Sequence, residues 1–484
     1  MTMLSELLPD ITLDDDVFIR DVTDDSRKVT KGSLYIAIKG QKNDGRKFIS
    51  EVENRAAAIL CDRSFPATST SVPVISVANL KSKRGEIASR FFGEPSKKLT
   101  IFAVTGTNGK TSVANFVATA ATNLGTQCGV MGTLGVGLPY ALDDNQIDRL
   151  TTPDPITLQS KLASLLTNGC SMVALEASSH GLSQMRLNGT RIKIAAYTNL
   201  SRDHLDYHLT MEAYLNAKRR LMEWPQLELA VLNSDDFHCQ EISKGIQAKK
   251  IFYGFNSKSD VVASSIRLHE TGMSFKLDSP WGTATLRSNL MGKFNVSNLL
   301  AAASVLGALG FDFKDSINFL GRIKNLPGRM HAFYKSSYPS IIVDYAHTPE
   351  ALRNVLVGIR SHCAGKIWCV FGCGGDRDRG KRRKMGEIAS DLADHLIITN
   401  DNPRFEEPQK IANDIIEGIE DNEIYSIELS RGLAIKKAIN EAAQGDVILI
   451  AGKGHESYQE IYGHKEPFND LATVEEYIST IQKG

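Results

Sequence analysis

The segment Thr105-Gly-Thr-Asn-Gly-Lys-Thr111 carries residue types that bind polyphosphates. It follows an apolar, β-prone run over residues 99–104 and precedes a predicted helix that starts near Ser112. A strand, a glycine turn and a helix start surround one concavity with backbone N–H groups and the positive end of the helix dipole. Lys110 adds a full positive charge, and the hydroxyl of Thr111 suits a phosphate-bound Mg²⁺. Val104 stands where the general P-loop pattern has its first glycine, yet the segment favours a nucleotide site over an ordinary turn. The predicted nucleotide loop comprises Thr105, Gly106, Thr107, Asn108, Gly109, Lys110, Thr111 and Ser112.

Three other segments could bind metals or anions, each with a purely structural alternative. Glu176 ends an apolar, strand-like run, where its carboxylate could bind Mg²⁺ or cap the following helix. His204 and His208 are four residues apart. That spacing can place two imidazoles on one helix face as metal ligands, although it is also common in polar surface sequence. Lys218 lies in a basic amphipathic run over residues 215–221, which could equally be a solvated helix face.

The composition excludes several classes of protein. The 484 residues suffice for about three domains. The 56 basic and 56 acidic residues cancel, so the net charge gives no reason to expect nucleic-acid or membrane binding. No apolar run reaches the length of a transmembrane helix, and the N-terminus has no basic, signal-like segment, so we expect a cytoplasmic location. The seven scattered cysteines include no C-x-x-C pair and indicate free thiols rather than disulfides.

The order of predicted elements indicates an α/β fold. Residues 1–98 mix short apolar runs with turn residues and predict a small N-terminal α/β domain. Over residues 99–328, apolar strands alternate with helical segments, which predicts a mainly parallel sheet with helices on both faces. Leu326-Pro-Gly-Arg329 interrupts this pattern, and residues 329–484 form a third, Rossmann-like α/β set. Polar residues follow several of its strands, where open α/β sheets bind their ligands.

Together these motifs resemble the Mur ligase superfamily and, within it, the MurE branch. The resemblance covers essentially the whole chain, including the N-terminal Asp25-Ser-Arg27. The matching motifs occur in the family's order: Gly106-Thr-Asn-Gly-Lys-Thr111, Glu176-Ala-Ser-Ser-His180, Asp203-His-Leu-Asp-Tyr-His208, Ala217-Lys-Arg219 and Asp344-Tyr-Ala-His-Thr-Pro349.

The resemblance implies a three-domain ligase of peptidoglycan synthesis that uses ATP and Mg²⁺. Its N-terminal domain would bind a UDP-sugar, its central domain ATP and its C-terminal domain the incoming amino acid. Such an enzyme adds meso-2,6-diaminopimelate to the D-Glu γ-carboxylate of UDP-MurNAc-L-Ala-D-Glu through an acyl phosphate. The implied partners are small molecules only, and we expect a monomer. In this family the lysine that matches Lys218 is carbamylated.

The resemblance also assigns roles to individual residues. Catalysis falls to Lys110, Glu176, His204 and Lys218, and metal binding to Thr111, Glu176, His204 and Lys218. The nucleotide site is completed by Asn295, Arg329, Asp344 and His347. The UDP-MurNAc-dipeptide would contact Ser26, Thr151, Thr152, Ser178, Gln184 and Arg186, whereas Gln41-Lys42-Asn43 departs from the family pattern near the uridine. The added amino acid would contact Arg377, Asp401, Asn402, Pro403, Arg404, Gly452 and Glu456.

By the same resemblance, Arg404 is the residue expected to discriminate between amino acids. Asp401-Asn-Pro-Arg404 matches the motif of the enzymes that add diaminopimelate, whose second head carries a carboxylate that lysine lacks. A planar guanidinium pairs bidentately with such a carboxylate. Three alternatives remain: the same ligase adding L-lysine, a folylpolyglutamate synthetase, or a non-catalytic nucleotide-binding regulator. Arg404 disfavours the lysine-adding ligase. The segments Asp25-Ser-Arg27 and Asp401-Asn-Pro-Arg404 disfavour a folylpolyglutamate synthetase. A non-catalytic regulator is disfavoured because all four predicted catalytic residues are present.

Overall fold

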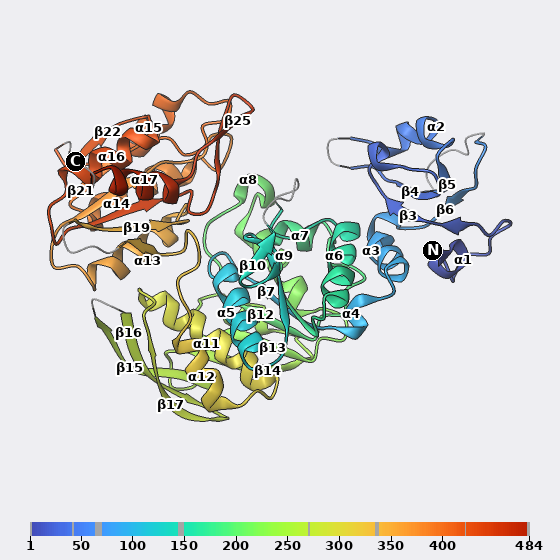
Figure 1. Cartoon of the computed structure of the whole chain (residues 1–484), viewed down its shortest axis with the longest axis horizontal. Coiled ribbons are helices and arrows are strands. Elements are labelled where there is room, and N and C mark those ends of the chain that lie inside the picture. The colour runs from blue at the N-terminus through green and yellow to red at the C-terminus, as the bar shows by residue number, and fades with distance from the viewer. Residues whose placement is uncertain are drawn as a thin grey trace.

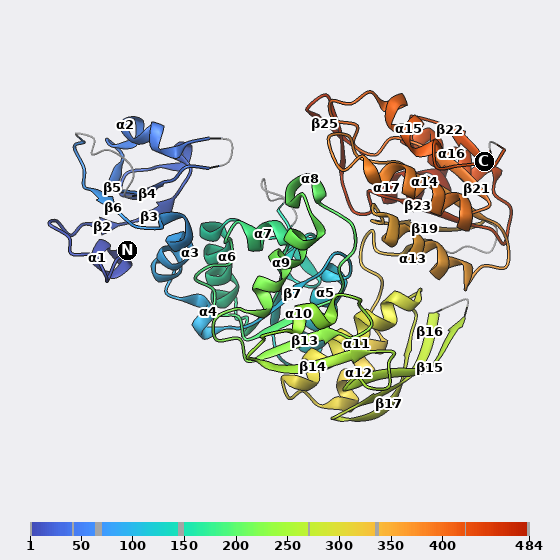
Figure 2. The ribbon, with the colours of Figure 1, turned by 180° about the vertical axis from the view of Figure 1, so that it is seen from behind.

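The protein consists of three lobes that follow one another along the chain (Figures 1 and 2). The computed structural model describes residues 2–40, 43–62, 70–143, 150–269, 272–333, 338–421 and 423–481. The N-terminal lobe, blue in Figure 1, and the C-terminal lobe, orange to red, lie on opposite sides of the central one. Gln41 and Lys42 lie outside the described residues, so their expected effect on uridine binding stays a prediction.

The N-terminal lobe contains a parallel sheet in the order β3-β4-β5-β6. Its strand β4 is buried along its whole length, so alternate residues pack into two separate clusters. The strands are β1 (Thr2–Met3), β2 (Phe18–Ile19), β3 (Asp21–Thr23), β4 (Ser33–Ala37), β5 (Ala56–Cys61) and β6 (Val74–Ser76). The helices are α1 (Leu4–Leu7), η1 (Ser26–Lys28), η2 (Gly45–Phe48), α2 (Ile49–Val52), α3 (Leu80–Phe91) and α4 (Pro95–Lys98).

The central sheet runs in the order β10-β9-β8-β11-β7-β12-β13-β14-β15-β16-β17. It is parallel from β8 to β15 and antiparallel at both ends. The strands are β7 (Thr100–Thr105), β8 (Cys128–Gly132), β9 (Gly135–Leu138), β10 (Ala141–Asp143), β11 (Met172–Glu176), β12 (Ile194–Tyr197), β13 (Leu229–Asn233), β14 (Lys249–Gly254), β15 (Val261–His269), β16 (Gly272–Ser279) and β17 (Gly282–Ser288).

Helices cover both faces of this sheet. On β7, Phe102 and Val104 pack with α5 (Lys110–Asn123) and α11 (Lys293–Ala308), whereas Ile101 and Ala103 pack with α6 (Pro155–Thr167) and α9 (Met211–Met222). A strand buried on both faces reads as a continuous apolar run, which is why β7 was recognisable in the sequence. The remaining helices are α7 (Ser179–Ser183), α8 (Leu205–His208), α10 (Cys239–Ser243) and α12 (Phe313–Gly321).

The C-terminal lobe has a sheet in the order β18-β19-β23-β20-β21-β22, parallel except for the edge pair β18 and β19. Helices α13, α14 and α15 pack on one face of this sheet, and α16 and α17 on the other. The strands are β18 (His331–Phe333), β19 (Ser340–Asp344), β20 (Ile367–Phe371), β21 (His395–Ile398), β22 (Tyr425–Ile427), β23 (Val447–Ala451), β24 (Tyr458–Ile461) and β25 (His464–Pro467). The helices are α13 (Pro349–Arg360), α14 (Gly380–Leu392), α15 (Pro408–Ile416), α16 (Arg431–Glu441) and α17 (Asp470–Ile481).

The predicted fold class is confirmed, with a small N-terminal α/β lobe, a mainly parallel central sheet and a Rossmann-like C-terminal lobe. The predicted domain boundaries, 98/99 and 328/329, fall between strands of different sheets and remain predictions. No helix in the described part of the chain is both long and apolar enough to cross a membrane.

Candidate active site

The predicted nucleotide loop connects β7 to α5 and depends on two glycines with positive φ. Gly106 has φ +153°, and a Cβ added there would lie 1.8 Å from Oγ1 of Thr198. Gly109 has φ +86°, and its Cβ would lie 2.6 Å from Oδ1 of Asn298. Only glycine fits such positions without displacing a neighbour. The loop is also tied to β12 and the segment after it, since Thr198 Oγ1 donates to the Asn108 carbonyl over 2.6 Å.

Lys110 is the first residue of α5, and its ammonium folds back over the loop. Its Nζ donates to the carbonyl oxygens of Gly106 at 2.8 Å and Thr107 at 2.9 Å. Burial lowers the pKa of Lys110, opposed by the nearby carboxylates of Glu176 and Asp203. Both of these acceptors are neutral, so the cation is available to a polyphosphate at the start of the helix.

Glu176 and Thr111 place oxygen ligands beside the loop. Glu176 is fully buried at the end of β11. Its Oε2 accepts from Thr111 Oγ1 and from Thr133 Oγ1, both at 3.0 Å, and its Oε1 accepts from the Thr133 N–H at 2.9 Å. Ser178, not Glu176, caps the following helix α7, so the capping alternative for this acid is excluded. A carboxylate and a hydroxyl suit Mg²⁺, which takes its remaining ligands from water and substrate phosphates.

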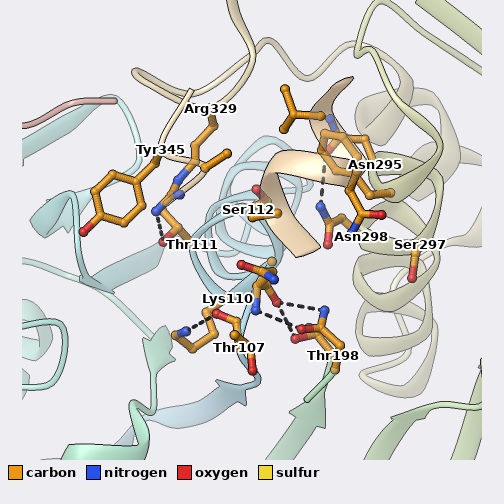
Figure 3. Close-up of a pocket in the computed structure, with 18 of the residues that line it drawn as sticks. Thr107, Lys110, Thr111, Ser112, Thr198, Asn295, Ser297, Asn298, Arg329 and Tyr345 are labelled. Atoms are coloured by element: carbon orange, nitrogen blue, oxygen red, sulfur yellow. Dashed lines mark hydrogen bonds between the residues drawn. The ribbon is translucent and has the colours of Figure 1, made fainter. Parts of the chain in front are cut away.

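A cavity of about 460 Å³ joins these residues to the C-terminal lobe. Its lining comes from segments far apart in the sequence: Thr107, Asn108, Gly109, Lys110, Thr111, Ser112, Thr151, Glu176, His204, Asn295, Arg329, Asp344 and His347. Figure 3 shows Arg329 beside Tyr345, pointing toward Thr111. Nη2 of Arg329 lies 3.3 Å from Thr111 Oγ1, and its guanidinium lies 4.4 Å from the ring centroid of Tyr345. Nε of Arg329 is buried without a hydrogen-bond partner in the described chain, as expected of a group that awaits an anion.

Asp344 holds the turn that carries Arg329. Oδ2 of Asp344 accepts from the Met330 N–H at 2.7 Å, and Oδ1 accepts from the Ala346 N–H at 2.8 Å. Burial raises the pKa of Asp344, while the charge of Arg329 opposes that shift. Beyond it, His347 reaches across to the central lobe, with Nε2 3.7 Å from Oδ2 of Asp203.

His204 and His208 do not share a helix face. His204 precedes α8 in a left-handed conformation with φ +54°, whereas His208 is buried, with Nε2 3.0 Å from Ser179 Oγ. Burial lowers the pKa of His204 to about 3 and that of His208 to about 4, so both imidazoles are neutral at pH 7. A neutral His204 lining the cavity can donate a lone pair to a cation. No three His, Cys, Asp or Glu side chains of the described residues converge as a metal-binding group.

Lys218 is buried on α9 with 1% of its surface exposed, and its Nζ lies 4.3 Å from the ring centroid of Tyr214. Burial and the charge of Lys110 lower the pKa of Lys218 well below its usual value. Such an environment favours a neutral amine, the form that reacts with CO₂. Lys218 does not line the cavity, in contrast to the other three predicted catalytic residues.

The residues predicted to bind the UDP-linked dipeptide form a connected network in the central lobe. Thr152 Oγ1 lies 3.0 Å from Ser178 Oγ. Arg186 donates through Nη1 to the Thr152 carbonyl at 2.7 Å and through Nη2 to Oε1 of Gln184 at 2.7 Å. Thr151 joins through Thr133, whose Oγ1 also contacts Glu176. Ser26 lies in η1 of the N-terminal lobe, and no described hydrogen bond links it to this network.

The two loops predicted to bind the amino acid meet at the C-terminal ends of β21 and β23. Nδ2 of Asn402 donates to Oε2 of Glu456 at 3.0 Å, and a Cβ on Gly452 would lie 2.7 Å from Oδ2 of Asp401. Pro403 is followed by Arg404, whose φ is +53°.

The two predicted arginines both lie close to Gly374. A Cβ on Gly374 would lie 3.0 Å from Nη1 of Arg404 and 3.6 Å from Cγ of Arg377. Arg377 also forms an ion pair of 3.5 Å with Asp206, so the amino-acid loops contact the central lobe.

Several residues of the cavity were missed by the sequence reasoning, namely Thr198, Asn199, Asp203, Asn298 and Tyr345. Asp203 begins the motif Asp203-His-Leu-Asp-Tyr-His208 and Asn199 precedes that motif by four residues, but the sequence predicts a ligand role there only for the histidines. Oδ1 of Asn199 accepts from the Asn108 N–H at 2.9 Å, so a polar residue directly after a strand was the available signal. Burial acts to raise the pKa of Asp203, but the hydrogen bond from His347 and the neighbouring His204 outweigh it and leave that pKa below its usual range.

Comparisons with known proteins identify the class of protein that this fold and site define. The Mur ligase middle domain matches residues 104–306, and the domain described as Mur ligase, glutamate ligase domain matches residues 328–454. The chain therefore belongs to the Mur ligase family.

Curated relatives that are 38–44% identical to this chain share one name. The UDP-N-acetylmuramoyl-L-alanyl-D-glutamate–2,6-diaminopimelate ligase of Coxiella burnetii is 43% identical over 466 residues, covering 94% of this chain and 95% of that protein. A solved structure of a ligase with the same name matches with a TM-score of 0.72 and 37% identity, covering 99% of each chain. A MurF ligase from Thermotoga maritima in complex with ADP matches with a TM-score of 0.62 and 18% identity, covering 89% of this chain and 93% of that one, which shows the fold alone.

Proposed function

We propose that this chain is an ATP-dependent ligase that adds meso-2,6-diaminopimelate to the D-Glu γ-carboxylate of UDP-MurNAc-L-Ala-D-Glu. The observation that carries the proposal is the pairing of two sites. A phosphate-binding loop lines one cavity with Arg329, and facing loops of the C-terminal lobe present Arg404 and Glu456, which suit a carboxylate and an ammonium. The names of relatives that are about 40% identical over nearly the whole chain agree with this substrate pair.

The reaction proceeds in two transfers. A γ-carboxylate oxygen of D-Glu attacks the γ-phosphorus of ATP, the bond to the β–γ bridging oxygen breaks, and ADP leaves. The amine of the amino acid then attacks the acyl-phosphate carbon, loses a proton, and phosphate departs as the amide forms. Two anions must meet in the first step, so positive charge at Lys110 and Arg329 stabilises the transferring phosphoryl group.

The site also fits the groups that the family uses beside ATP. Thr111 and Glu176 would hold Mg²⁺ at the nucleotide, and His204 would contribute to a second ion. Bound Mg²⁺ offsets the charge of the phosphates. Lys218, buried and favouring the neutral amine, fits carbamylation by CO₂, which would convert it into an anionic oxygen donor.

The structure favours diaminopimelate over L-lysine as the added amino acid. Arg404 is 19% exposed in its side chain and anchored by two hydrogen bonds, so its charge is already placed for a substrate carboxylate. L-Lysine would leave that guanidinium without a carboxylate from the substrate. The lost pairing costs several kcal/mol, which corresponds to a discrimination of about 10⁴-fold against L-lysine. We further propose a monomer acting in the cytoplasm, where ATP and UDP-linked precursors are available.

The test is phosphate release from ATP by the purified protein with UDP-MurNAc-L-Ala-D-Glu and Mg²⁺. Parallel reactions contain meso-diaminopimelate, L-lysine or no amino acid. Release that depends on diaminopimelate, with the matching mass gain in the UDP product, is expected. A preference for L-lysine would contradict the role of Arg404, and no release with either amino acid would contradict the ligase itself.

A further inference from the structure

Lys453 is a fully buried lysine in the loop after β23, and no motif in the sequence assigned it a role. None of its surface is exposed, yet its Nζ lies between two of the residues predicted to bind the amino acid. Nζ donates to Oε2 of Glu456 at 2.7 Å and to Oδ1 of Asn402 at 3.1 Å. A buried ammonium is costly unless it is paired, and these two contacts supply its partners.

The three side chains form a closed ring of hydrogen bonds. Nδ2 of Asn402 donates to the same Oε2 of Glu456, at 3.0 Å. Oε2 therefore receives two donors, whereas Oε1 has no hydrogen-bond partner among the described residues. The Glu456 side chain is 22% exposed, so the ring fixes one oxygen of the carboxylate and leaves the other to a ligand.

The ring extends to the arginine that is predicted to bind the substrate carboxylate. Oδ1 of Asn402 also accepts from the backbone N–H of Glu460, at 2.9 Å. The Glu460 side chain in turn accepts from Nε of Arg404, and the Glu460 carbonyl accepts from the Arg404 N–H at 2.9 Å. One connected network of hydrogen bonds thus fixes the side chains of both Glu456 and Arg404, which are proposed to bind opposite charges.

We propose that Lys453 is a positioning residue that gives this site its selectivity for the configuration of an amino acid whose far end carries both an ammonium and a carboxylate. The inference rests on the proposed function. Lys453 cannot touch the substrate, because it is wholly buried, and it acts through Glu456 and Asn402. Its charge holds the Glu456 carboxylate in one orientation, with Oε1 directed to the ammonium of the far head.

The test compares Lys453→Met, which removes the donor and the charge, with Lys453→Gln, which keeps a donor. Each is assayed with meso-diaminopimelate and with the L,L isomer, which has the same charges but the opposite configuration at the far head. We expect Lys453→Met to lower kcat/KM for the meso isomer by about 30-fold and to reduce the preference for it, with KM for ATP within about 2-fold of wild type. Lys453→Gln is expected to retain part of the preference.

A double-mutant cycle separates positioning from general stability. If Lys453 acts through Glu456, Lys453→Met combined with Glu456→Gln is no worse than Glu456→Gln alone. The matched control is Lys437→Met, which removes a partly buried lysine whose Nζ donates to Ser426 Oγ in the same lobe, and which should leave kcat/KM unchanged.

The outcomes distinguish the two proposals. Wild-type protein that releases no phosphate with diaminopimelate would overturn both. Active wild type with unchanged isomer preference in Lys453→Met, or additive losses in the double mutant, would overturn only the role of Lys453. If Lys453→Met does not fold, Lys453→Gln takes its place. An unchanged isomer preference in Lys453→Gln, or additive losses when it is combined with Glu456→Gln, would then overturn the role of Lys453.

Discussion

Nε of Arg404 donates to Oε2 of Glu460 over 3.1 Å, and Nη1 of Arg404 donates to the carbonyl of Gly375 over 2.7 Å. These two contacts fix the plane of the guanidinium. Nη2 has no hydrogen-bond partner within the described chain and is therefore free for a substrate carboxylate. The arginine is anchored on one side and open on the other, as a selective carboxylate site requires.

Replacing this arginine with lysine tests the anchoring. We expect Arg404→Lys to lower kcat/KM for meso-diaminopimelate by about 100-fold, because an ammonium cannot keep both anchors and also pair with the substrate. Phosphate release at varied diaminopimelate measures this, with KM for ATP expected to stay constant. Arg383→Lys, at an exposed arginine that pairs with Glu387, is the matched control. An Arg404→Lys variant with the wild-type kcat/KM for meso-diaminopimelate would contradict the assignment.

The parts of this molecule that were predictable from sequence are those with local signals. The strand β7, the glycine turn and Lys110 were recognisable because a buried strand is a continuous apolar run and because few sequences can form a phosphate-binding loop. By contrast, the fully buried ion pair between Arg431 and Asp470 connects residues far apart in the chain, and no local sequence pattern around either residue predicts it. Its arginine also donates to the Ala451 carbonyl, next to the amino-acid loop.

The residues that line the cavity also divide into those with a local sequence signal and those without one. Glu176, for which the sequence predicts a site role, lines the cavity, and so do Asn298 of helix α11 and Tyr345 of the turn after β19, for which it predicts none. The positions of these two residues depend on tertiary packing, within the central lobe for Asn298 and between lobes for Tyr345, which no local period or turn signal encodes. The sequence likewise makes no prediction for Lys453, whose contacts with Glu456 and Asn402 exist only in the folded chain.

Lys110 should contribute to activity at the expense of stability. Its ammonium is held by two neutral carbonyls and carries the cost of burial, as its lowered pKa indicates. We expect Lys110→Met to lower kcat by about 100- to 1,000-fold while leaving the free energy of unfolding unchanged or higher. Urea unfolding and phosphate release on the same preparation measure both quantities. A clear loss of stability would show that the lysine supports the loop rather than a phosphate.

The contact between the N-terminal and central lobes depends on a glycine in α3. A Cβ added to Gly85 would lie 1.8 Å from the carbonyl oxygen of Asn188, which is backbone and cannot move aside cheaply. We expect Gly85→Ala to lower the free energy of unfolding by about 1–3 kcal/mol and to raise KM for the UDP-linked substrate. Urea unfolding and steady-state kinetics provide the two readouts.

The control for this prediction is Gly432→Ala on α16, where the nearest atom to an added Cβ is 3.7 Å away. Removing glycine there should raise the free energy of unfolding by about 0.4–1 kcal/mol, since it restricts only the unfolded chain. Equal effects of the two substitutions would show that the close approach at Gly85 is not what holds the two lobes together.

Glu406 should make stability depend on pH in the acid range. Hydrogen bonds from the fully buried Arg382, at 2.9 and 3.0 Å, lower the pKa of Glu406 from 4.5 to about 2. Because the folded pKa lies below the unfolded one, this carboxylate adds stability above pH 4.5 and loses it as the pH falls toward 2. We expect Glu406→Gln to cost about 3 kcal/mol at pH 7 and progressively less below pH 4, measured by urea unfolding across that range.

The control is Glu387→Gln, which removes an exposed ion pair with Arg383 and should cost less than about 1 kcal/mol. A penalty for Glu406→Gln that stayed constant between pH 7 and pH 3 would show that Arg382 does not hold this carboxylate in its charged form.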